Sequence, residues 1–584
     1  MNPIPPTAVR RRAPPSRRAG SAGAVDSSEE LVAFLLNPRS YPHRPRRVHL
    51  LQTHASFVFI APPFVFKVKK PVNFGFLDFS SLEKRRHFCE REVALNRRLA
   101  PKIYLDVLPI SRIQGRLTFG MGEAVVEYTV KMRRMTDGYF LDKLLGRNGV
   151  DPGDIDRIAA TLKDFYQGQR PNEEIESWGR IERLRISTDE NFQQTEKFVG
   201  EAAVSTDAPV GEGSAFEGVQ DCPVNPTISR PAFETIRFYT NEFYKRQARL
   251  FESRVREKWI RDCHGDLHLE HVHLTPGDLS IYDCIEFNDR FRYVDVASDA
   301  AFLAMDLDYK GRPDLGRYFA RRMAAELQDD GMPRLMDFYK CYRAYVRGKV
   351  ESLQSIARAM PEKERLAAAE RARRYFKLAL QYTVAGSKPR VLVVMGRIAS
   401  GKSTLARALA AKLGWPIYSS DSVRKQLAGV PLYERTRAVL RRRLYSAART
   451  GQTYRSLFAA AEVEVHAGRS VILDATFARR EHRAAVRDHF SPRGIAVVFV
   501  EAQASDIAAK RRLKARELKS NEVSDARFED FQRLANLYDP PLELRGRRFA
   551  TVCTTGSLEQ TVTRALRSLV RLRLEFTCPS QRIQ

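Results

Sequence analysis

The segment VLVVMGRIASGKST at residues 391–404 is the part of the sequence that most restricts the fold. An apolar run leads into the pattern G-x-x-x-x-G-K-[ST], completed by Gly396, Gly401, Lys402 and Ser403, and then into the helical segment TLARALAAKL. In this order, main-chain N–H groups surround phosphates, the lysine reaches the β- and γ-phosphates, and the hydroxyl binds Mg²⁺. The sequence therefore predicts a site for ATP and Mg²⁺. Its expected nucleotide-binding residues are Gly396, Ser400, Gly401, Lys402, Ser403 and Thr404.

Strands and helices alternate after this loop. The runs SVILDA (470–475) and AVVFVEA (496–502) are short and apolar, as buried strands are. This alternation is typical of a parallel α/β sheet. Asp474 ends the first of these strands, where a carboxylate is suited to holding the water shell of magnesium. The alternative is an aspartate that caps the next helix.

Two further groups of polar residues are candidates for the same site. In YSSDSVRKQLAG, Asp421 begins a helix and Arg424 follows about one turn later, so the carboxylate can act on an acceptor hydroxyl while the arginine holds an anionic group. Arg512 and Arg516 also lie one turn apart and can close over phosphates as a lid. The alternatives are an ordinary helix cap with a surface arginine and a solvated basic helix face.

Residues 390–560 resemble the small P-loop kinases, a group that includes polynucleotide 5′-kinase, gluconate kinase and shikimate kinase. The resemblance rests on GRIASGKST, SSDSVRK, ILDATF and RLKAR. It implies that Asp421 faces the acceptor hydroxyl and that Arg512 and Arg516 belong to a lid. An AAA-type motor is the alternative, disfavoured because the segment is short and shows no sensor or arginine-finger region.

A second unusual segment, HGDLHLEHVHL at residues 264–274, contains four of the chain's 11 histidines. His268 and His271, or His271 and His273, are candidate zinc ligands. A complete zinc site needs three or four converging ligands, and period-two alternation would place His271 and His273 on one strand face, with His264 far away. We therefore expect another role for this segment.

That role is suggested by the catalytic loop of kinases, H-R-D-x-x-x-x-N, in which the aspartate orients the substrate proton and the asparagine binds Mg²⁺. Asp266 occupies the position of the aspartate, and His271 the position of the asparagine. The strand LSIYDCIEF follows, and its acids Asp283 and Glu286 are candidate metal ligands.

The upstream elements of a kinase are present in the expected order. FVFKVKK offers Lys67 or Lys69 as a phosphate-binding lysine on a strand. The helix CEREVALNRRLA offers Glu92, with Glu90 as the alternative, to pair with that lysine. The order lysine, glutamate, catalytic loop and metal-binding acid favours a kinase-like domain more than any one motif does.

Residues 45–350 resemble the aminoglycoside phosphotransferase-like family, on the motifs KVKKPVNFGFLDFS, EVALNRRLAP, HGDLHLEH and IYDCIEFNDRFRYVDVASDAAFLAMDLD. The resemblance implies a two-lobed kinase-like fold with Asp266 as the catalytic aspartate and Asp283 or Glu286 binding magnesium. It also implies that His264 ties the loop to neighbouring backbone, and that Asp295 and Asp299 hold the loop in place.

Two features depart from the family pattern. The chain has no G-x-G-x-x-G, so the phosphate-covering loop would be near His54–Ser56 or Ala61–Pro63. His271 replaces asparagine, and magnesium prefers oxygen ligands. These departures predict weak catalysis, a shift towards manganese, or nucleotide binding without turnover. The order of the two modules resembles bacterial fusion proteins that join an aminoglycoside phosphotransferase-like domain to an ATP-binding domain.

With 584 residues the chain is long enough for two to four domains. We expect an α/β and α+β protein, in which a two-lobed kinase-like domain precedes a P-loop parallel α/β domain. The expected segments are a Pro/Arg-rich disordered tail (1–27, with a transit peptide as the alternative), the kinase-like domain (28–384, with a flexible insert at 199–231), a linker (385–389), the P-loop domain (390–576) and a tail (577–584). Seven scattered cysteines without a CxxC pair, and the lack of an apolar run of membrane-spanning length, favour a cytoplasmic protein.

Lys and Arg number 98 against 70 Asp and Glu, a formal net charge of +28. This charge favours anionic partners, although an arginine-rich solvated surface is an equal alternative. The leading hypothesis is an ATP-dependent phosphotransferase acting on a hydroxyl group of an unidentified small molecule. A polynucleotide 5′-hydroxyl kinase, suggested by the charge and by the arginines at 441–443, is the second hypothesis. A nucleotide-sensing regulator with a degenerate first kinase domain is the third.

Overall fold

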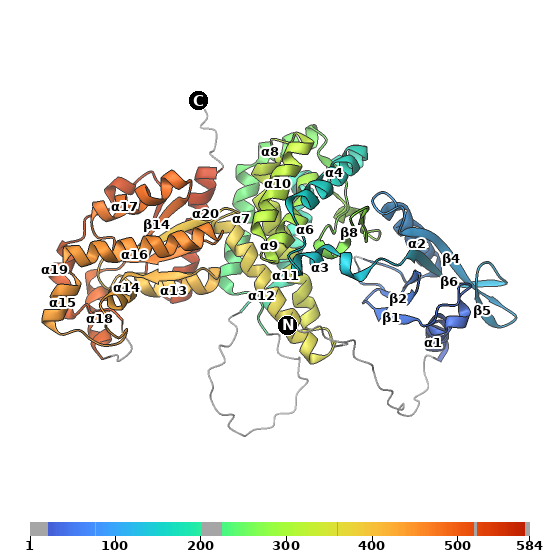
Figure 1. The fold of residues 1–584 in the computed structure, drawn as a ribbon, viewed down its shortest axis with the longest axis horizontal. Helices are drawn as coiled ribbons and strands as arrows, with labels where there is room; N and C mark the ends of the chain where they lie inside the picture. Colours follow the sequence, from blue (N-terminus) through green and yellow to red (C-terminus); the bar gives the residue numbers. More distant parts are fainter. Residues whose placement is uncertain (1–21, 76, 201–224, 359, 519–522, 578–584) are drawn as a thin grey trace, which may run out of the picture. The chain divides into compact units, whose positions relative to one another are not determined.

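The computed structural model describes residues 22–75, 77–200, 225–358, 360–518 and 523–577. The chain divides into two compact units, and Figure 1 labels their elements. The first unit comprises Met1–Tyr139 with Ser280–Asn288, and the second comprises Phe140–Leu279 with Asp289–Gln584. The segments that the sequence places on either side of residues 385–389 both contribute to the second unit.

A six-stranded antiparallel sheet, in the order β1-β2-β3-β6-β4-β5, forms most of the first unit. The strands are β1 (His49–Gln52), β2 (Ser56–Ala61), β3 (Phe64–Lys69), β4 (Tyr104–Ile113), β5 (Arg116–Phe119) and β6 (Ala124–Arg133), and the helices α1 (Ala22–Leu36) and α2 (Leu82–Asn96) accompany them. Strands β2 and β3 form a hairpin, in which Phe59 lies opposite Phe66.

Helix α1 begins at Ala22, inside the segment that the sequence assigns to the N-terminal tail. The C-terminal end of this helix is apolar, and Leu35 is fully buried in a core that includes Phe59 and Phe66. Residues 1–21 of the predicted tail lie outside the described residues, as do residues 578–584 at the other end.

The first half of the second unit is mainly helical. Its helices are α3 (Leu141–Gly146), α4 (Pro152–Gly168), α5 (Glu173–Ser177), α6 (Ile181–Thr195), α7 (Arg230–Arg246), α8 (Ala248–Arg256), α9 (Val296–Tyr309), α10 (Pro313–Leu327), α11 (Met332–Ser355) and α12 (Glu362–Val384). Short strands lie at β7 (Ile260–Asp262), β8 (Val272–Leu274), β9 (Leu279–Ile281) and β10 (Tyr293–Asp295). Of the predicted insert, residues 201–224 lie outside the described residues, while Val199 forms a β-bridge with Ile228.

The second half contains the predicted parallel sheet, in the order β12-β13-β11-β14-β15. Its strands are β11 (Arg390–Met395), β12 (Ile417–Ser419), β13 (Val471–Asp474), β14 (Ala496–Gln503) and β15 (Phe549–Cys553). Its helices are α13 (Lys402–Leu413), α14 (Ser420–Leu427), α15 (Ala438–Leu444), α16 (Ala447–His466), α17 (Arg480–Phe490), α18 (Asp506–Glu517), α19 (Phe531–Asn536) and α20 (Leu558–Thr577). Since β11 is the central strand, the glycine-rich loop after it emerges in the middle of the sheet's carboxyl edge.

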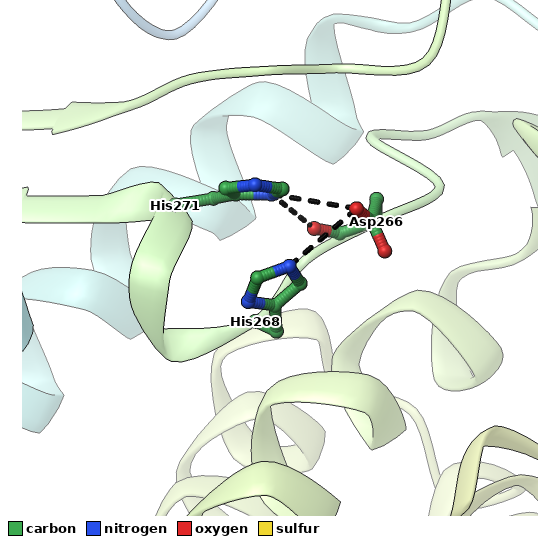
Figure 2. Close-up of side chains that lie close together, drawn as sticks. All are labelled: Asp266, His268 and His271. Carbon is green, nitrogen blue, oxygen red and sulfur yellow. Dashed lines mark hydrogen bonds and ion pairs between the residues drawn. The ribbon is translucent and has the colours of Figure 1, made fainter. Parts of the chain in front are cut away.

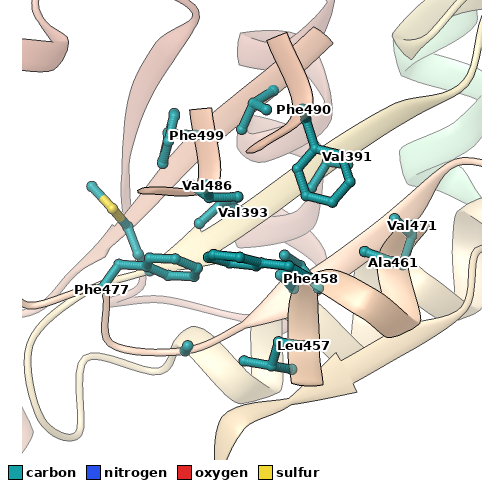
Figure 3. Packing of buried hydrophobic residues seen from close by; sticks show 14 of the residues in the cluster. Val391, Val393, Leu457, Phe458, Ala461, Val471, Phe477, Val486, Phe490 and Phe499 are labelled. Atoms are coloured by element: carbon teal, nitrogen blue, oxygen red, sulfur yellow. The ribbon is translucent and has the colours of Figure 1, made fainter. Parts of the chain in front are cut away.

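A buried apolar core holds this sheet against α16 and α17. Val391 and Val393 of β11 pack with Phe458 of α16 and Phe490 of α17, as Figure 3 shows. Alternate residues of a strand point to opposite faces, so the face of β11 that carries Val391 and Val393 is covered by α16 and α17. The core fixes the ends of β11 and β13, from which the candidate site is built.

Residues 385–389 form a packed turn between α12 and β11. The Ser387 N–H and hydroxyl donate hydrogen bonds to Asp337 Oδ1 of α11, at 3.0 and 2.5 Å. Arg573 of α20 donates to Asp337 Oδ2 at 2.9 Å and to the carbonyl oxygen of Tyr382. The C-terminal helix is therefore fastened to the helical half of the second unit.

Two further predictions concern the whole chain. Within the described ranges, no helix is both long and apolar enough to cross a membrane. The five cysteines that the structure describes are free thiols.

Candidate functional site

The loop between β11 and α13 has the backbone that its glycines predict. Gly401 has φ +89°, and a Cβ there would lie 3.0 Å from Arg512 Nη1 and 3.2 Å from Thr554 Oγ1. Gly396 has φ +149°, and a Cβ there would lie 2.5 Å from the carbonyl oxygen of Ala502. A side chain at either position would therefore be strained or would collide with its neighbours. Lys402 and Ser403 begin α13 directly after this turn, and Thr404 follows them.

Buried polar atoms without a protein partner mark the same place. Among the described residues, Ser400 Oγ and Asp474 Oδ1 are buried, and neither atom has a hydrogen-bond partner within the protein. Buried polar atoms normally make hydrogen bonds. Two such atoms without a protein partner beside a glycine-rich loop are explained by a ligand that supplies the partners. This arrangement fits a nucleotide phosphate chain with Mg²⁺.

Asp474 lies at the carboxyl end of β13, next to the start of α13. The Ser403 hydroxyl donates a hydrogen bond to its carboxylate. Burial raises the pKa of Asp474, against the lowering effects of Lys402 and of the Ser403 hydrogen bond. The ionised Asp474 carboxylate is only partly solvated, so a cation that binds beside it stabilises its charge.

Arg512 and Thr554 brace the glycine-rich loop from outside. Arg512 Nη1 donates to the carbonyl oxygen of Ala399 at 3.4 Å and to Thr554 Oγ1 at 3.0 Å. The Thr554 hydroxyl donates in turn to the carbonyl oxygen of Ser400 at 2.6 Å. Thr554 is a residue that the sequence reasoning missed, although it follows directly after the sheet strand β15, whose carboxyl end faces the same edge. Arg516 is on the same helix as Arg512, and its carbonyl oxygen accepts from Arg435 at 2.7 Å.

The proposed acceptor residues occupy the first turns of α14. Asp421 Oδ1 accepts a hydrogen bond of 3.4 Å from the Tyr445 hydroxyl. Arg424 is largely buried, donates to the carbonyl oxygen of Leu444 at 2.9 Å and to Thr450 Oγ1 at 3.1 Å, and lies over the Tyr445 ring. These protein contacts hold Arg424 in place, and its predicted contact with an anionic substrate stays a prediction.

The candidate lysines of the first unit share one buried glutamate. Glu92 is fully buried and accepts from Lys67 at 2.8 Å and from Lys69 at 2.7 Å. Lys67 also contacts Asp283 Oδ1 at 2.9 Å, and Lys69 contacts Glu286. The sequence offers Lys67 or Lys69 as alternatives. In the structure both take part in one network, in which each lysine bridges Glu92 to one candidate metal-binding acid.

The charges of this network stabilise one another. Burial opposes the charged form of both lysines, but the surrounding carboxylates outweigh it and raise the pKa of Lys67 and of Lys69. Burial raises the pKa of Glu286, whereas the two ammonium groups hold the pKa of Glu92 below its usual value. The alternative partner Glu90 is exposed and pairs with Arg86 instead. Residues His54–Ser56 lie at the turn between β1 and β2, and Ala61–Pro63 at the turn between β2 and β3.

The histidine segment brings three donor side chains together in the second unit. One donor atom each from Asp266, His268 and His271 lies within 4.8 Å of the other two, and Figure 2 shows the three side chains converging. His268 Nε2 lies 3.5 Å from Asp266 Oδ2, and His271 Nδ1 donates to the Asp266 carbonyl oxygen at 2.9 Å. Burial opposes ionisation of Asp266, but His268, His271 and Arg347 lower its pKa, and Asp266 in turn raises the pKa of the buried His268.

The rest of the segment holds this group in place. The backbone N–H groups of His264 and Gly265 donate to Asp299 at 3.0 and 2.9 Å, as expected for Asp299, and His264 Nδ1 accepts from the Asp266 N–H at 3.3 Å. Asp295 caps α9 and pairs with Arg254.

The strand-based placement of the histidines is wrong. His271 ends a 3₁₀ turn, Leu269–His271, and only His273 lies on β8. The ring centroids of His264 and His271 are 6.1 Å apart, so His264 is not far away. The backbone turns at Leu269 before the strand begins, which period-two alternation cannot represent.

Residues 391–541 match the family described as AAA domain. The matched range includes the glycine-rich loop, Asp421 and Asp474. A gluconokinase of Gluconobacter oxydans is 44% identical over 62 residues, covering 10% of this chain and 35% of that protein. A solved gluconokinase from Sinorhizobium meliloti has 21% identity and a TM-score of 0.24, with 32% of this chain and 96% of that chain covered. The APS kinase CysC of Mycobacterium tuberculosis has 19% identity and a TM-score of 0.23, with 31% and 98% covered.

A longer similarity extends beyond residues 391–541. The protein named Uncharacterized protein Rv2004c, of Mycobacterium tuberculosis (strain ATCC 25618 / H37Rv), is 32% identical over 465 residues, covering 80% of this chain and 85% of that protein. Uncharacterized protein Mb2027c of Mycobacterium bovis matches to the same extent. The chain belongs to the family of these mycobacterial proteins.

Proposed function

We propose that the protein is an ATP-dependent phosphotransferase whose C-terminal domain transfers the γ-phosphoryl group to a hydroxyl of a small molecule. The observation that carries this proposal is the buried Asp474 carboxylate, which is hydrogen-bonded to Ser403 and keeps one oxygen without a protein partner. That pairing, at the start of a helix that follows a glycine-rich loop, is the arrangement that holds a nucleotide with its magnesium ion.

Each residue of the site has a chemical task in this proposal. Ser403 and Asp474 would hold Mg²⁺, which would neutralise phosphate charge, and ATP would supply the phosphoryl group. The backbone N–H groups of the loop and Lys402 bind the phosphates, while Arg512 keeps the loop closed against β15. Asp421 orients the acceptor hydroxyl and accepts its proton, with Tyr445 fixing the carboxylate. Arg424 holds an anionic group of the substrate, and Arg516 belongs to the lid over the phosphates.

The test is transfer from γ-labelled ATP to a panel of hydroxyl-bearing metabolites and 5′-hydroxyl oligonucleotides. We expect the wild type to label at least one small molecule and Lys402→Ala to reduce that labelling by a factor of about 100 or more, since it removes a charge from the phosphates. Asp266→Ala is the matched control, because Asp266 belongs to the other module. Undiminished labelling by Lys402→Ala would refute the assignment to this domain, and labelling of oligonucleotides alone would favour the polynucleotide kinase.

A second candidate function belongs to the kinase-like segment, residues 28–384. The observation that favours it is the network in which Lys67 and Lys69 share Glu92 and reach Asp283 and Glu286. We propose that this segment has the two-lobed kinase-like fold of the aminoglycoside phosphotransferase-like family and binds a second nucleotide.

Two measurements test this second site. Equilibrium dialysis should give two ATP molecules per wild-type chain and one per Lys402→Ala chain. His271→Asn then separates an attenuated kinase from a regulator: a rise in magnesium-dependent turnover identifies an attenuated active site, and unchanged nucleotide binding without turnover identifies a nucleotide-sensing domain. One ATP per wild-type chain would contradict the two-site proposal.

A further inference from the structure

We propose that Asp266, His268 and His271 form a binding site for a divalent transition-metal ion, such as Zn²⁺ or Co²⁺, distinct in chemistry from a magnesium site. The three side chains offer one carboxylate and two imidazoles from a single short segment (Figure 2). Imidazole is a preferred ligand of zinc and cobalt, whereas magnesium selects oxygen. The proposal concerns metal binding and does not depend on phosphotransfer by either module.

The spacing of the donor atoms agrees with such an ion. Zinc binds nitrogen and oxygen at about 2.0–2.2 Å, so two donors of a tetrahedral site lie roughly 3.4 Å apart. His268 Nε2 and Asp266 Oδ2 are already 3.5 Å apart. The whole set of three donors lies within 4.8 Å, so a small inward movement of side chains is sufficient to bring all of them to one ion.

The position of His271 provides a second observation. Its Nδ1 lies 3.6 Å from Asp266 Oδ2, close to the separation of two donors on one ion. The same Nδ1 is 2.9 Å from the carbonyl oxygen of Asp266 and donates to it when it carries the ring proton. An ion bound at Nδ1 would replace that proton, with the ring in its other neutral tautomer.

The surroundings hold the three donors before any metal arrives. His268 is buried, packs on Phe302 of α9, and has its ring centroid 3.8 Å from that of His271. The backbone N–H of Leu269, between the two histidines, donates to Asp306 at 3.1 Å. Fixed ligands lose little freedom on binding, which favours affinity.

The site is open on one side. The side-chain exposed fraction is 33% for Asp266, compared with 13% for His271 and 5% for His268. Three protein ligands with an accessible carboxylate leave a fourth position for water, the composition found in zinc sites that keep an open position.

The experiment is a metal titration of the full-length protein after removal of metals by a chelator. Excess Mg²⁺ is kept present so that oxygen-rich sites are saturated. We expect wild type to bind one Zn²⁺ per chain at this site in equilibrium dialysis, and Co²⁺ to give the visible absorption of a tetrahedral or five-coordinate ion with nitrogen ligands. His271→Asn and His268→Phe should each weaken binding about tenfold or more, since each removes one ligand.

His273→Phe is the matched control, because His273 is a buried histidine of the same segment that packs against Phe140 and lies outside the cluster. It should bind metal as the wild type does. Binding at the exposed Cys553 thiol would be common to all variants and is subtracted by the comparison. If the His268→Phe, His271→Asn double variant binds as much Zn²⁺ as the wild type, with circular dichroism showing both folded, the proposal is overturned. Failure of the Lys402→Ala labelling experiment would leave this outcome unaffected.

Discussion

The hydroxyl of Thr554 donates a hydrogen bond of 2.6 Å to the carbonyl oxygen of Ser400, joining the end of β15 to the middle of the glycine-rich loop. Arg512 donates to the same hydroxyl. The loop that is expected to bind phosphates is therefore fixed through a residue more than a hundred positions further along the chain.

Thr554→Val is expected to weaken ATP binding. The substitution keeps the shape of the side chain but leaves the Ser400 carbonyl oxygen without its partner, a loss of about 1–2 kcal/mol or a five- to thirtyfold weaker affinity. Fluorescent-nucleotide titration measures it. Thr554→Ser retains the hydroxyl and should bind nearly as the wild type does; equal weakening in both variants would show that the methyl group, not the hydrogen bond, matters.

Asp474→Asn is expected to preserve the thermal stability of the protein and to abolish the effect of Mg²⁺ on ATP binding. The carboxylate is buried with one oxygen unpaired, so replacing it with a neutral amide removes the cost of a buried charge and should leave the melting temperature of the ligand-free protein unchanged or higher. ATP binding should lose its dependence on Mg²⁺. Calorimetric titration of ATP with and without Mg²⁺ measures this, with the exposed Asp488→Asn as control. A lower melting temperature would contradict the account of Asp474.

Substitutions of Lys67 and Lys69 are expected to lower the free energy of unfolding by different amounts, although both lysines contact Glu92. The Lys69 side chain is 1% exposed, so Lys69→Met leaves the buried Glu286 without its ion-pair partner and should cost about 3–5 kcal/mol, while Glu92 keeps Lys67. The Lys67 side chain is 17% exposed, so Lys67→Met should lower the free energy of unfolding by a smaller amount. Hydrogen exchange of the β3 amides reports the local free energy of opening. Equal losses for Lys67→Met and Lys69→Met would show that burial does not distinguish the two ion pairs.

Asp337 is expected to stabilise the protein in a pH-dependent way. Burial alone would raise its pKa, but Arg573, Ser387, Lys340 and Arg390 hold the pKa below the usual value of 3.8. The unfolded chain therefore binds the proton more readily, so this contribution is present above pH 3.8 and is lost as the pH falls through the lower pKa of the folded state. The melting-temperature difference between wild type and Asp337→Asn should shrink at acid pH; a constant difference would contradict this coupling.

The sequence predicted most of the C-terminal domain because its motifs are local. A strand, a glycine-rich loop and a helix are adjacent in the chain, so Gly396 to Thr404 were found from spacing alone, and the parallel sheet followed from the alternation around them. Thr554 could not be found in this way, since its role comes from a strand pairing that joins distant segments.

The histidine segment shows a different limit. Alternation along a strand would place His271 and His273 on one face, whereas the structure turns the backbone at Leu269 and brings the carboxylate of Asp266 beside His268 and His271. The third donor, Asp266, was assigned from the sequence as a catalytic aspartate and not as a metal ligand. In the first unit, alternation along β3 places Lys67 and Lys69 on the same face of the strand. It cannot reveal that Glu92 of α2 lies between them, because that position depends on the packing of a separate helix.

The contact between Arg573 and Asp337 has a consequence for dividing the protein into fragments. A fragment ending at residue 389 would lack α20 and with it Arg573, which is 5% exposed and donates to both Asp337 and the Tyr382 carbonyl. Helices α7 and α12, which α20 contacts, would be uncovered. Residues 385–389 thus separate two sequence motifs without separating two autonomous folding modules, so we expect recombinant fragments cut there to aggregate.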